Sequence, residues 1–573
     1  MHAPFAVRRG DSSVAEDTPM LSEHGDRDKH VWDEVSTTAP ALGFLEFYDR
    51  STIISLFIYF IFTKGMVAGV GIIYLMQVSF CRKTLDVDAR QCQIMGVIAS
   101  IPWSLRGVIA VVLCHWKEVA SPGANMVRYY KSAEELFIML ASALCIVCLL
   151  MLSLGTYSSV AAGVLLGALN LGICIIDVIF NGVYSRMVQK GHAYRDGKSK
   201  QGVHADRYDY ASTLIFLSAT SYQVGAILAA SIVGPVVEYF DPRRIFLVAA
   251  ALVATNFIPV GFNLLHQVDV SAIPHTDAQS VVVYRKFRNV SIMTSVLAVC
   301  NTALSIVLQE SHSLAAFSVV SICIVTAYNY YLFQDASVSD ALTNGEIQRM
   351  LASGSGTDYS RFYAVGVTLI LLQTALFGNI FAAEAYFLTQ KDGCPSSMPR
   401  FSYIDFNTVG AIISAVAGWL GIQMFRRYLA HETLHLMFVA TAWLQISVRS
   451  LRALMPLGLF QTGGVLNWPF FLVVYCIIAP LCTYMYNMPS LLLIPHLIRP
   501  EHATTGYACI VSLQSYSRVV AIQLGLLAIE LSRLQENGPC DFCDLWLIQM
   551  GSQVLLPLLF IPLLYNYIPK TKL

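Results

Sequence analysis

The chain has 573 residues, of which 56% are hydrophobic and only 13% are charged, whereas about 25% of the residues in a typical globular protein are charged. This deficit excludes an ordinary soluble protein, because soluble domains need polar surfaces. Lys and Arg together number 37, and so do Asp and Glu. The equality excludes the basic excess that is typical of nucleic-acid-binding proteins. We therefore expect lipid to surround most of the chain.

The first 50 residues are polar and contain no apolar core of a signal peptide, so we expect a disordered cytoplasmic tail at 1–50. From Ile53 onward, apolar runs of about 20 residues recur, and this is the length of a helix that crosses a bilayer. Uninterrupted runs favour helices over the alternating strands of a barrel. Fourteen runs are expected to span, at residues 53–80, 92–114, 136–155, 159–180, 210–235, 245–265, 290–309, 313–334, 362–388, 404–425, 432–455, 465–494, 503–532 and 546–568.

Basic residues predict the orientation, since the cytoplasmic loops of membrane proteins are rich in Lys and Arg. The richest segment extends from Arg186 to Arg207, after the fourth run, and it places that loop and both termini in the cytoplasm. Fourteen spans fit this pattern best, and twelve is the nearest alternative. Several cysteines then fall in or beside external loops, where disulfides can form in pairings that the sequence leaves open: Cys81, Cys92, Cys394, Cys540 and Cys543.

The chain divides at a polar segment, 266–289, which we expect to be a cytoplasmic linker after an N-terminal six-helix half at 51–265. The pattern D-x-x-x-N-G-x-x-x-R-M occurs at 177–187 and again at 340–350. This repeat is consistent with the duplicated halves of transporters, although chance can also produce it. Duplication makes 290–334 an inserted helical hairpin and 335–573 the C-terminal six-helix half. The expected fold is an all-α polytopic membrane bundle of 12–14 helices in two pseudo-symmetric halves.

Three cations, Lys64, Arg106 and Arg518, lie near the centres of expected spans. Each costs about 2.5–3.5 kcal/mol at such a position on insertion scales, so each is a candidate functional residue. Arg449 and Arg452 lie nearer the outer end of a span, where snorkelling to the interface explains them. A central cavity with cations favours an anionic solute. The alternative is that the central cations pair with peripheral acids and fix the helices in place.

Acidic and aromatic residues complete the candidate binding site. Asp177 lies near the cytoplasmic end of the fourth span and Glu384 toward an outer end, and both are candidates for coupling transport to an ion. Trp103 and Tyr386 are candidates for stacking on a flat ring of the substrate. The alternative for both aromatic residues is an interfacial or core position, which is common in membrane proteins.

A set of ordered segments resembles the folate–biopterin transporter family, a branch of the major facilitator superfamily that includes protozoan pteridine transporters. These segments are Lys64-Gly65, Gly69-Val70, Pro102-Trp103-Ser104-Leu105-Arg106-Gly107, Gly182 with Tyr184-Ser185-Arg186-Met187, Gly234-Pro235, Phe401-Ser402-Tyr403, Phe406-Asn407-Thr408-Val409, Met488-Pro489 and Pro539-Cys540-Asp541-Phe542. The resemblance implies a major-facilitator-like fold, alternating access, a folate or pterin substrate, proton coupling and a place in the plasma membrane. It implies no cofactor, and the expected partners are the solute, protons and the bilayer.

Some positions depart from that family's pattern. Arg106 stands where Lys is usual, and Cys114 and Asn181 stand where acids are expected. These differences leave open another organic solute, such as S-adenosylmethionine, or a membrane sensor or scaffold that does not transport. An enzyme is a further alternative, because residues 431–435 read H-E-x-x-H, a zinc-binding pattern on a helix. No third ligand follows at a suitable spacing, so we expect neither a metal site nor an enzyme.

Overall fold

In the computed structural model of the chain, the described residues are 48–69, 71–119, 126–199, 210–262, 264, 278–307, 311–333, 359–389, 399–430, 432–457, 467–498, 503–531 and 544–565. The helices lie in one compact unit, Arg50–Leu573, and residues 1–49 form a separate unit. The tail expected at 1–50 therefore lies almost wholly outside the described residues.

Every described element is helical except for an isolated bridge between Thr389 and Arg400, and the all-α prediction is therefore confirmed. The first part of the bundle contains α3 (Arg50–Ile58), η1 (Tyr59–Val67), α4 (Ile72–Ser79), η2 (Phe80–Thr84), α5 (Ala89–Ser104), α6 (Arg106–Val119), α7 (Met126–Leu154), α8 (Ser159–Ser199), α9 (Tyr210–Tyr239), η4 (Pro242–Arg244), α10 (Ile245–Val253), η5 (Ala254–Asn256) and α11 (Phe257–Gly261).

The second part begins with α12 (Ala278–Val307) and α13 (Ser311–Phe333) and continues to Tyr565. Its other elements are α16 (Tyr359–Ala375), α17 (Phe381–Leu388), η6 (Asp405–Gly410), α18 (Ala411–Tyr428), α19 (Leu434–Arg452), α20 (Asn467–Phe470), η7 (Phe471–Ile478), α21 (Ala479–His496), α22 (Ala503–Leu531), α23 (Leu545–Met550), η9 (Gly551–Leu555) and α24 (Leu556–Tyr565).

Twelve helices of the described part are long and apolar enough to cross a membrane. The two other expected spans, 362–388 and 546–568, are also helical, but their apolar helices are shorter, at 364–375 and 545–559. The structure therefore contains helices at all fourteen apolar runs, and the expected count of 12–14 is confirmed.

The span at 359–388 is broken between α16 and α17. In lipid, a broken helix requires other partners for the freed backbone groups. The Gly378 amide donates to the Ser552 carbonyl at 3.1 Å, and the Asn379 amide donates to the Ala521 carbonyl at 2.8 Å. The Asn379 carbonyl in turn accepts from Gln93 Nε2 at 2.6 Å. Groups on neighbouring helices thus provide hydrogen-bond partners for the backbone at the break, as in the discontinuous helices of transporters.

Two expected boundaries differ from the structure. Helix α12 begins at Ala278, so the second half of the segment expected as a linker at 266–289 is helical. Helix α8 continues to Ser199, so much of the basic segment that begins at Arg186 extends the fourth span rather than forming a loop. Apolar patterning marks only the lipid-embedded part of a helix, which explains both differences. The second copy of the repeated pattern, at 340–350, lies outside the described residues.

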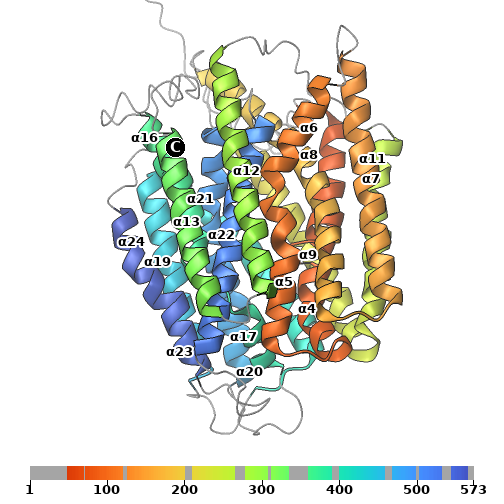
Figure 1. Ribbon diagram of the computed structural model, residues 1–573, viewed down its shortest axis with the longest axis vertical. Helices are drawn as coiled ribbons and strands as arrows, with labels where there is room; N and C mark the ends of the chain where they lie inside the picture. Colours follow the sequence, from red (N-terminus) through yellow and green to blue (C-terminus); the bar gives the residue numbers. More distant parts are fainter. Residues whose placement is uncertain are drawn as a thin grey trace, which may run out of the picture. The chain divides into compact units, whose positions relative to one another are not determined.

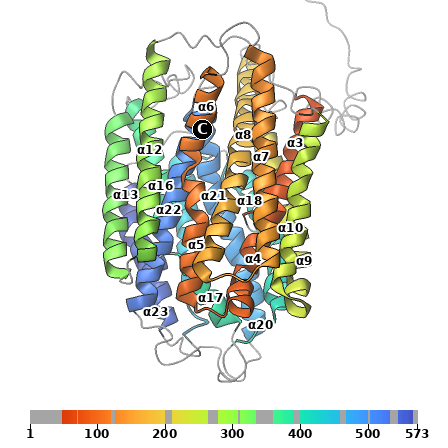
Figure 2. The same ribbon diagram turned by 45° about the vertical axis from the view of Figure 1, so that its right-hand side comes forward.

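Helix α22 lies inside the bundle and packs against α5, α6 and α8 from the first part of the chain and against α12, α13 and α16 from the second (Figure 1). Helices α12 and α13 form an antiparallel pair beside α16 (Figure 2). A buried polar network joins this pair to α22. Asn301 Nδ2 donates to the Tyr516 hydroxyl at 3.0 Å, and Gln523 Nε2 donates to Ser305 Oγ at 3.0 Å. These bonds fix the rotation of α22 about its axis.

Candidate functional site

Asp177 on α8 is fully buried and lies at the centre of a charged cluster. Its Oδ1 lies 3.0 Å from Lys64 Nζ, and its Oδ2 lies 2.8 Å from Arg106 Nη2. The Tyr59 hydroxyl also donates to Oδ1, and Lys64 Nζ donates to Asn181 Oδ1 at 3.5 Å. One carboxylate therefore pairs with two cations, so the cluster of Lys64, Arg106 and Asp177 has a net charge of +1.

Local backbone irregularities position both cations. Lys64 lies on η1, a π-helical segment, and π-helical turns are frequent at functional sites. Arg106 is the first residue of α6, directly after a break that follows Pro102, because a proline interrupts the bonding of the helix that contains it. The break separates α5 from α6 at Leu105.

Trp103 lies under Arg106, with the guanidinium carbon 4.3 Å from the ring centroid. This contact orients Arg106 by a cation–π interaction. Within the described part of the chain, Nε of Arg106 makes no hydrogen bond. Trp103 therefore belongs to the same cluster as Lys64, Arg106 and Asp177, and it holds Arg106 from beneath while one donor of the guanidinium is unused.

Arg518 differs from the other two central cations. Its side chain is exposed, although it lies midway along α22, which is enclosed by helices of both parts of the chain. An arginine facing lipid at this depth is strongly disfavoured, so its exposed surface must face a hydrated interior space. It interacts electrostatically with Arg106, Tyr222 and Tyr484. No acidic partner of Arg518 occurs among the described residues.

Three tyrosines are linked to Arg518, directly or through one another, by electrostatic interactions. Tyr222 on α9 and Tyr484 on α21 are half-buried and lie close enough to Arg518 to interact with it electrostatically. Tyr74 on α4 interacts electrostatically with Tyr222, and Tyr484 interacts with Tyr74. Tyr74 is 38% exposed and stacks on Phe381 with ring centroids 4.5 Å apart. These aromatic side chains come from both parts of the chain.

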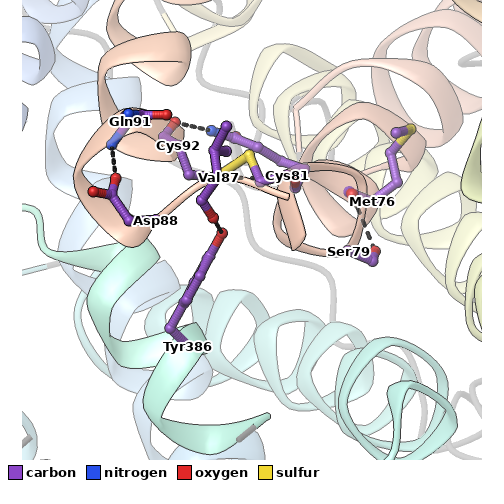
Figure 3. The surroundings of a disulfide bond; sticks show 9 residues. Met76, Ser79, Cys81, Val87, Asp88, Gln91, Cys92 and Tyr386 are labelled. Atoms are coloured by element: carbon purple, nitrogen blue, oxygen red, sulfur yellow. Dashed lines mark hydrogen bonds between the residues drawn. A yellow bond between two sulfur atoms is a disulfide. The ribbon is translucent and has the colours of Figure 1, made fainter. Parts of the chain in front are cut away.

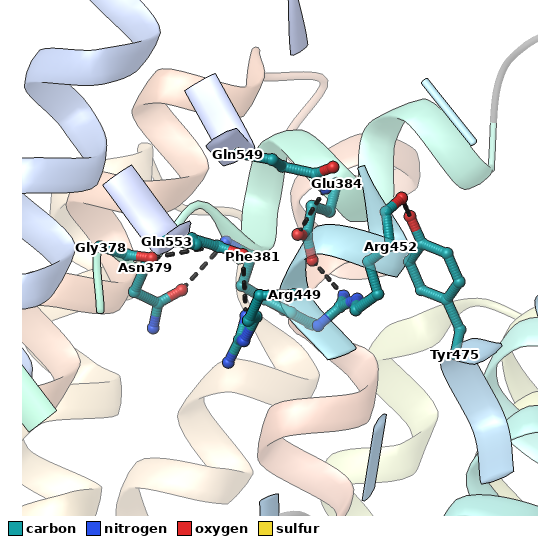
Figure 4. A network of polar contacts seen from close by, with 9 residues as sticks. All are labelled: Gly378, Asn379, Phe381, Glu384, Arg449, Arg452, Tyr475, Gln549 and Gln553. Carbon is teal, nitrogen blue, oxygen red and sulfur yellow. Dashed lines mark hydrogen bonds and ion pairs between the residues drawn. The ribbon is translucent and has the colours of Figure 1, made fainter. Parts of the chain in front are cut away.

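Glu384 on α17 lies in a second charged cluster, drawn in Figure 4. Arg452 Nη2 forms an ion pair with Glu384 Oε2, and Gln549 Nε2 donates to Glu384 Oε1 at 2.7 Å. The Tyr475 hydroxyl donates to the Arg452 carbonyl at 2.9 Å, and its ring centroid lies 4.5 Å from the Arg452 guanidinium carbon. Arg452 is therefore held by a buried carboxylate rather than by snorkelling to the interface.

Arg449 lies one helical turn before Arg452 and is half-buried. Its Nη1 donates to Gln553 Oε1 at 3.1 Å, as Figure 4 shows. It interacts electrostatically with Glu384 and Tyr74, but Glu384 makes its ion pair with Arg452. This cluster, like the one around Asp177, contains two cations and one carboxylate.

Tyr386 lies apart from the central cations. Its hydroxyl donates to the Val87 carbonyl at 2.7 Å, beside the Cys81–Cys92 disulfide (Figure 3). Arg82 stacks over the Tyr386 ring at 5.2 Å and donates to the Thr389 carbonyl. The structure thus places Tyr386 at the end of the bundle that carries the disulfide, which we call the disulfide end, where it ties the first two spans to α17.

The H-E-x-x-H pattern gains no support as a metal site. His431 is outside the described residues, and within the described ranges no group of three metal-binding side chains occurs. His435 lies in the first turn of α19.

Sequence reasoning did not find several residues that complete these clusters. Tyr59 and Gln549 bind the two carboxylates. Tyr74, Tyr222 and Tyr484 interact electrostatically with one another, and Tyr74 also interacts with the cluster around Glu384. A weak signal existed for Tyr59, which precedes Lys64 by five residues, the spacing of one π-helical turn. The others are ordinary span residues, and only the packing of distant helices brings them together.

Comparison with solved structures shows the fold. An auto-inhibited peptide transporter of the POT family is similar with a TM-score of 0.58 and 11% identity, covering 90% of this chain and 96% of that one. A POT family transporter in complex with 5-aminolevulinic acid gives 0.52 and 15%, covering 91% and 96%. A nucleoside transporter gives 0.50 and 12%, covering 90% and 98%. The major-facilitator-like bundle is thereby confirmed, and the similar structures are transporters rather than enzymes.

The assignment to the folate–biopterin transporters is corrected by these comparisons. The similar solved structures are peptide transporters and a nucleoside transporter, so neither folate nor pterin is carried forward as the solute. A search of curated proteins found no match. The family that the comparisons do show is defined by a sequence model that matches residues 68–572. With nearly all of its helices inside that match, the chain belongs to the BT1 family.

Proposed function

We propose that the protein is a transporter that moves a small organic anion across a membrane by alternating access. In this mechanism the two helical parts rock around a site near mid-membrane. Lys64, Arg106 and Arg518 attract the anionic group, and Trp103 holds Arg106 in place. Tyr386 stays a candidate substrate contact only for a solute that has reached the disulfide end.

The observation that carries this proposal is Arg518, which is exposed and has no acidic partner among the residues that the structure describes. Lys64 and Arg106 share Asp177, but Arg518 faces the same region without an acidic partner in the described part of the chain. An arginine fork binds both oxygens of a carboxylate, and the surrounding low-dielectric protein strengthens the interaction. An anionic solute would therefore replace the missing partner of Arg518.

The charge balance supports the same conclusion. The two clusters together with Arg518 contain five cations but two carboxylates, Asp177 and Glu384. A cationic solute such as S-adenosylmethionine would meet repulsion there. The structural neighbour crystallised with 5-aminolevulinic acid, a carboxylic acid, shows that this fold can hold such a solute.

Coupling to protons belongs to the proposal as well. Protonation of Asp177 would release Lys64 and Arg106 together, and protonation of Glu384 would release Arg452. Either event would change which cations are available to the anion, so binding of the solute and binding of a proton would be linked. We place the protein in the plasma membrane, with both termini in the cytoplasm.

The proposal is tested with purified protein in proteoliposomes. Carboxylic acids of different classes, including 5-aminolevulinic acid, are each compared with their methyl esters for uptake. We expect uptake of acids and at least tenfold lower uptake of the esters. Equal uptake of acid and ester, or uptake of S-adenosylmethionine alone, would reject the anion site. A solute that binds but is never moved under an imposed proton gradient would instead identify a sensor or scaffold.

A further inference from the structure

The cluster around Glu384 has a surplus cation of its own, Arg449. A guanidinium has five N–H donors. In the described part of the chain, Arg449 makes one hydrogen bond, to Gln553. The side chain is half-buried, so its other donors are not enclosed in dry protein. By contrast, Nε of Arg452 is buried beside the paired carboxylate. Arg449 is therefore the cation of this cluster that a solute can reach.

Tyr74 comes from the other part of the chain and interacts electrostatically with this cluster, with Arg452 and Glu384 most strongly and with Arg449 after them. It belongs to the first span, whereas Arg449 belongs to α19. The two side chains interact electrostatically, and Tyr74 is 38% exposed. An aromatic hydroxyl that interacts electrostatically with a guanidinium can supply a further donor for an oxyanion. Arg449 and Tyr74, which we call the outer subsite, thus present donors from both helical parts to the same space.

Aromatic side chains link the outer subsite to Arg518 through electrostatic interactions. Arg518 interacts with Tyr222 and Tyr484, and each of these tyrosines interacts with Tyr74. Electrostatic interactions thus link Arg518 to two tyrosines, these tyrosines to Tyr74, and Tyr74 to Arg449. Half-buried tyrosine rings bind flat or apolar groups well. The arrangement fits a solute with an anionic group at each end and a flat middle.

We propose that Arg449 and Tyr74 form a second anion-binding subsite, so that the preferred solute carries two anionic groups, one at Arg518 and one at Arg449. This inference rests on the proposed anion transport and adds the substrate class. It also gives the second anionic group a mechanical role. Tyr74 and Arg449 belong to different helical parts. A dianion that contacts both residues therefore favours an arrangement in which the two parts lie close together at this site.

The test measures binding to purified full-length protein with probes of matched shape. Terephthalate, naphthalene-2,6-dicarboxylate and biphenyl-4,4′-dicarboxylate span a range of lengths, and the monomethyl ester of each removes one charge. Wild-type protein is compared with Arg449→Gln, Arg449→Lys and Arg518→Gln. Arg427→Gln is the matched control, because Arg427 is an exposed arginine in the last turn of α18.

We expect wild-type protein to bind at least one diacid about tenfold or more tightly than its monoester. Arg449→Gln should abolish that preference by weakening diacid binding much more than monoester binding, Arg449→Lys should keep part of the preference, and the control should keep all of it. A preference that survives in Arg449→Gln, equal weakening of both ligands by that variant, or no binding of any diacid by wild-type protein would overturn the inference. Unchanged binding of both ligands in Arg518→Gln would instead overturn the proposed function.

Discussion

The two charged clusters each contain two cations and one carboxylate, but they differ in how the surplus cation is held. In the first, Lys64 and Arg106 both contact Asp177, which is fully buried, so two cations share one carboxylate. In the second, the one ion pair of Glu384 within the described ranges is with Arg452, and Arg449 donates to the neutral amide of Gln553. The first arrangement fixes three helical segments together, whereas the second leaves one arginine available.

This difference separates structural charge from functional charge. A carboxylate with two cations stabilises the packing, because removal of one partner from a buried ion pair costs about 3–5 kcal/mol. An arginine with one neutral contact contributes little to packing but costs little to redirect toward a solute. We therefore expect Asp177 to matter most for folding and Arg518 and Arg449 to matter most for the solute.

The largest effect is expected for Asp177→Asn. This change leaves Lys64 and Arg106 without a counter-ion inside the bundle, so we expect a loss of about 3–5 kcal/mol of stability. Size-exclusion chromatography in detergent should show mostly aggregated protein. The double variant Asp177→Asn with Lys64→Gln removes one of the two unpaired charges and should recover part of the folded fraction. A single variant that is as stable as wild type would contradict the account of this cluster.

A smaller effect is expected for Glu384→Gln. Arg452 keeps its contact with the Tyr475 ring, and the new amide oxygen can still accept a hydrogen bond from Gln549 or Arg452, so we expect a loss of about 1–3 kcal/mol. Thermal unfolding followed by tryptophan fluorescence measures it. If Glu384→Gln destabilises the protein more than Asp177→Asn, the comparison between the clusters is wrong.

The smallest effect is expected when the Cys81–Cys92 disulfide is removed. The entropy model gives about 3 kcal/mol for a closed loop of similar length, but spanning helices keep both ends close even after tertiary unfolding. We therefore expect about 1 kcal/mol or less, measured as the shift in melting temperature of Cys81→Ser with Cys92→Ser. Loss of all uptake in a well-folded double variant would show instead that the disulfide end needs this bond to work.

Much of the fold could be predicted from the sequence. The length of an apolar run is set by the thickness of the bilayer, so all fourteen runs correspond to helical segments. Ends were less predictable, since α8 and α12 extend beyond their apolar parts. The break at Gly378 was not predicted either, because its backbone partners, Ser552 and Ala521, are distant in the chain.

The candidate site was predictable only in part. Buried charge is costly, and this identified Lys64, Arg106 and Arg518 without reference to a structure. The sequence could not tell that two of them share Asp177 while Arg518 has no acidic partner in the described part of the chain, because pairing depends on how spans pack. The same limit explains Arg449, whose position near a helix end suggested snorkelling, and Tyr386, which is bonded to Val87.

The most direct measurement is the reactivity of a cysteine placed at Arg518. In a variant in which every cysteine outside the Cys81–Cys92 disulfide is replaced by serine, Arg518→Cys is treated with an anionic and a cationic methanethiosulfonate of similar size. Both reagents are applied to folded protein in membranes. Cys323, exposed on α13, is restored alone as the lipid-facing control and should react with neither reagent. We predict that position 518 reacts, and that the anionic reagent reacts about tenfold faster, because the hydrated interior is positively charged. No reaction, or a faster reaction with the cationic reagent, would contradict the central claim.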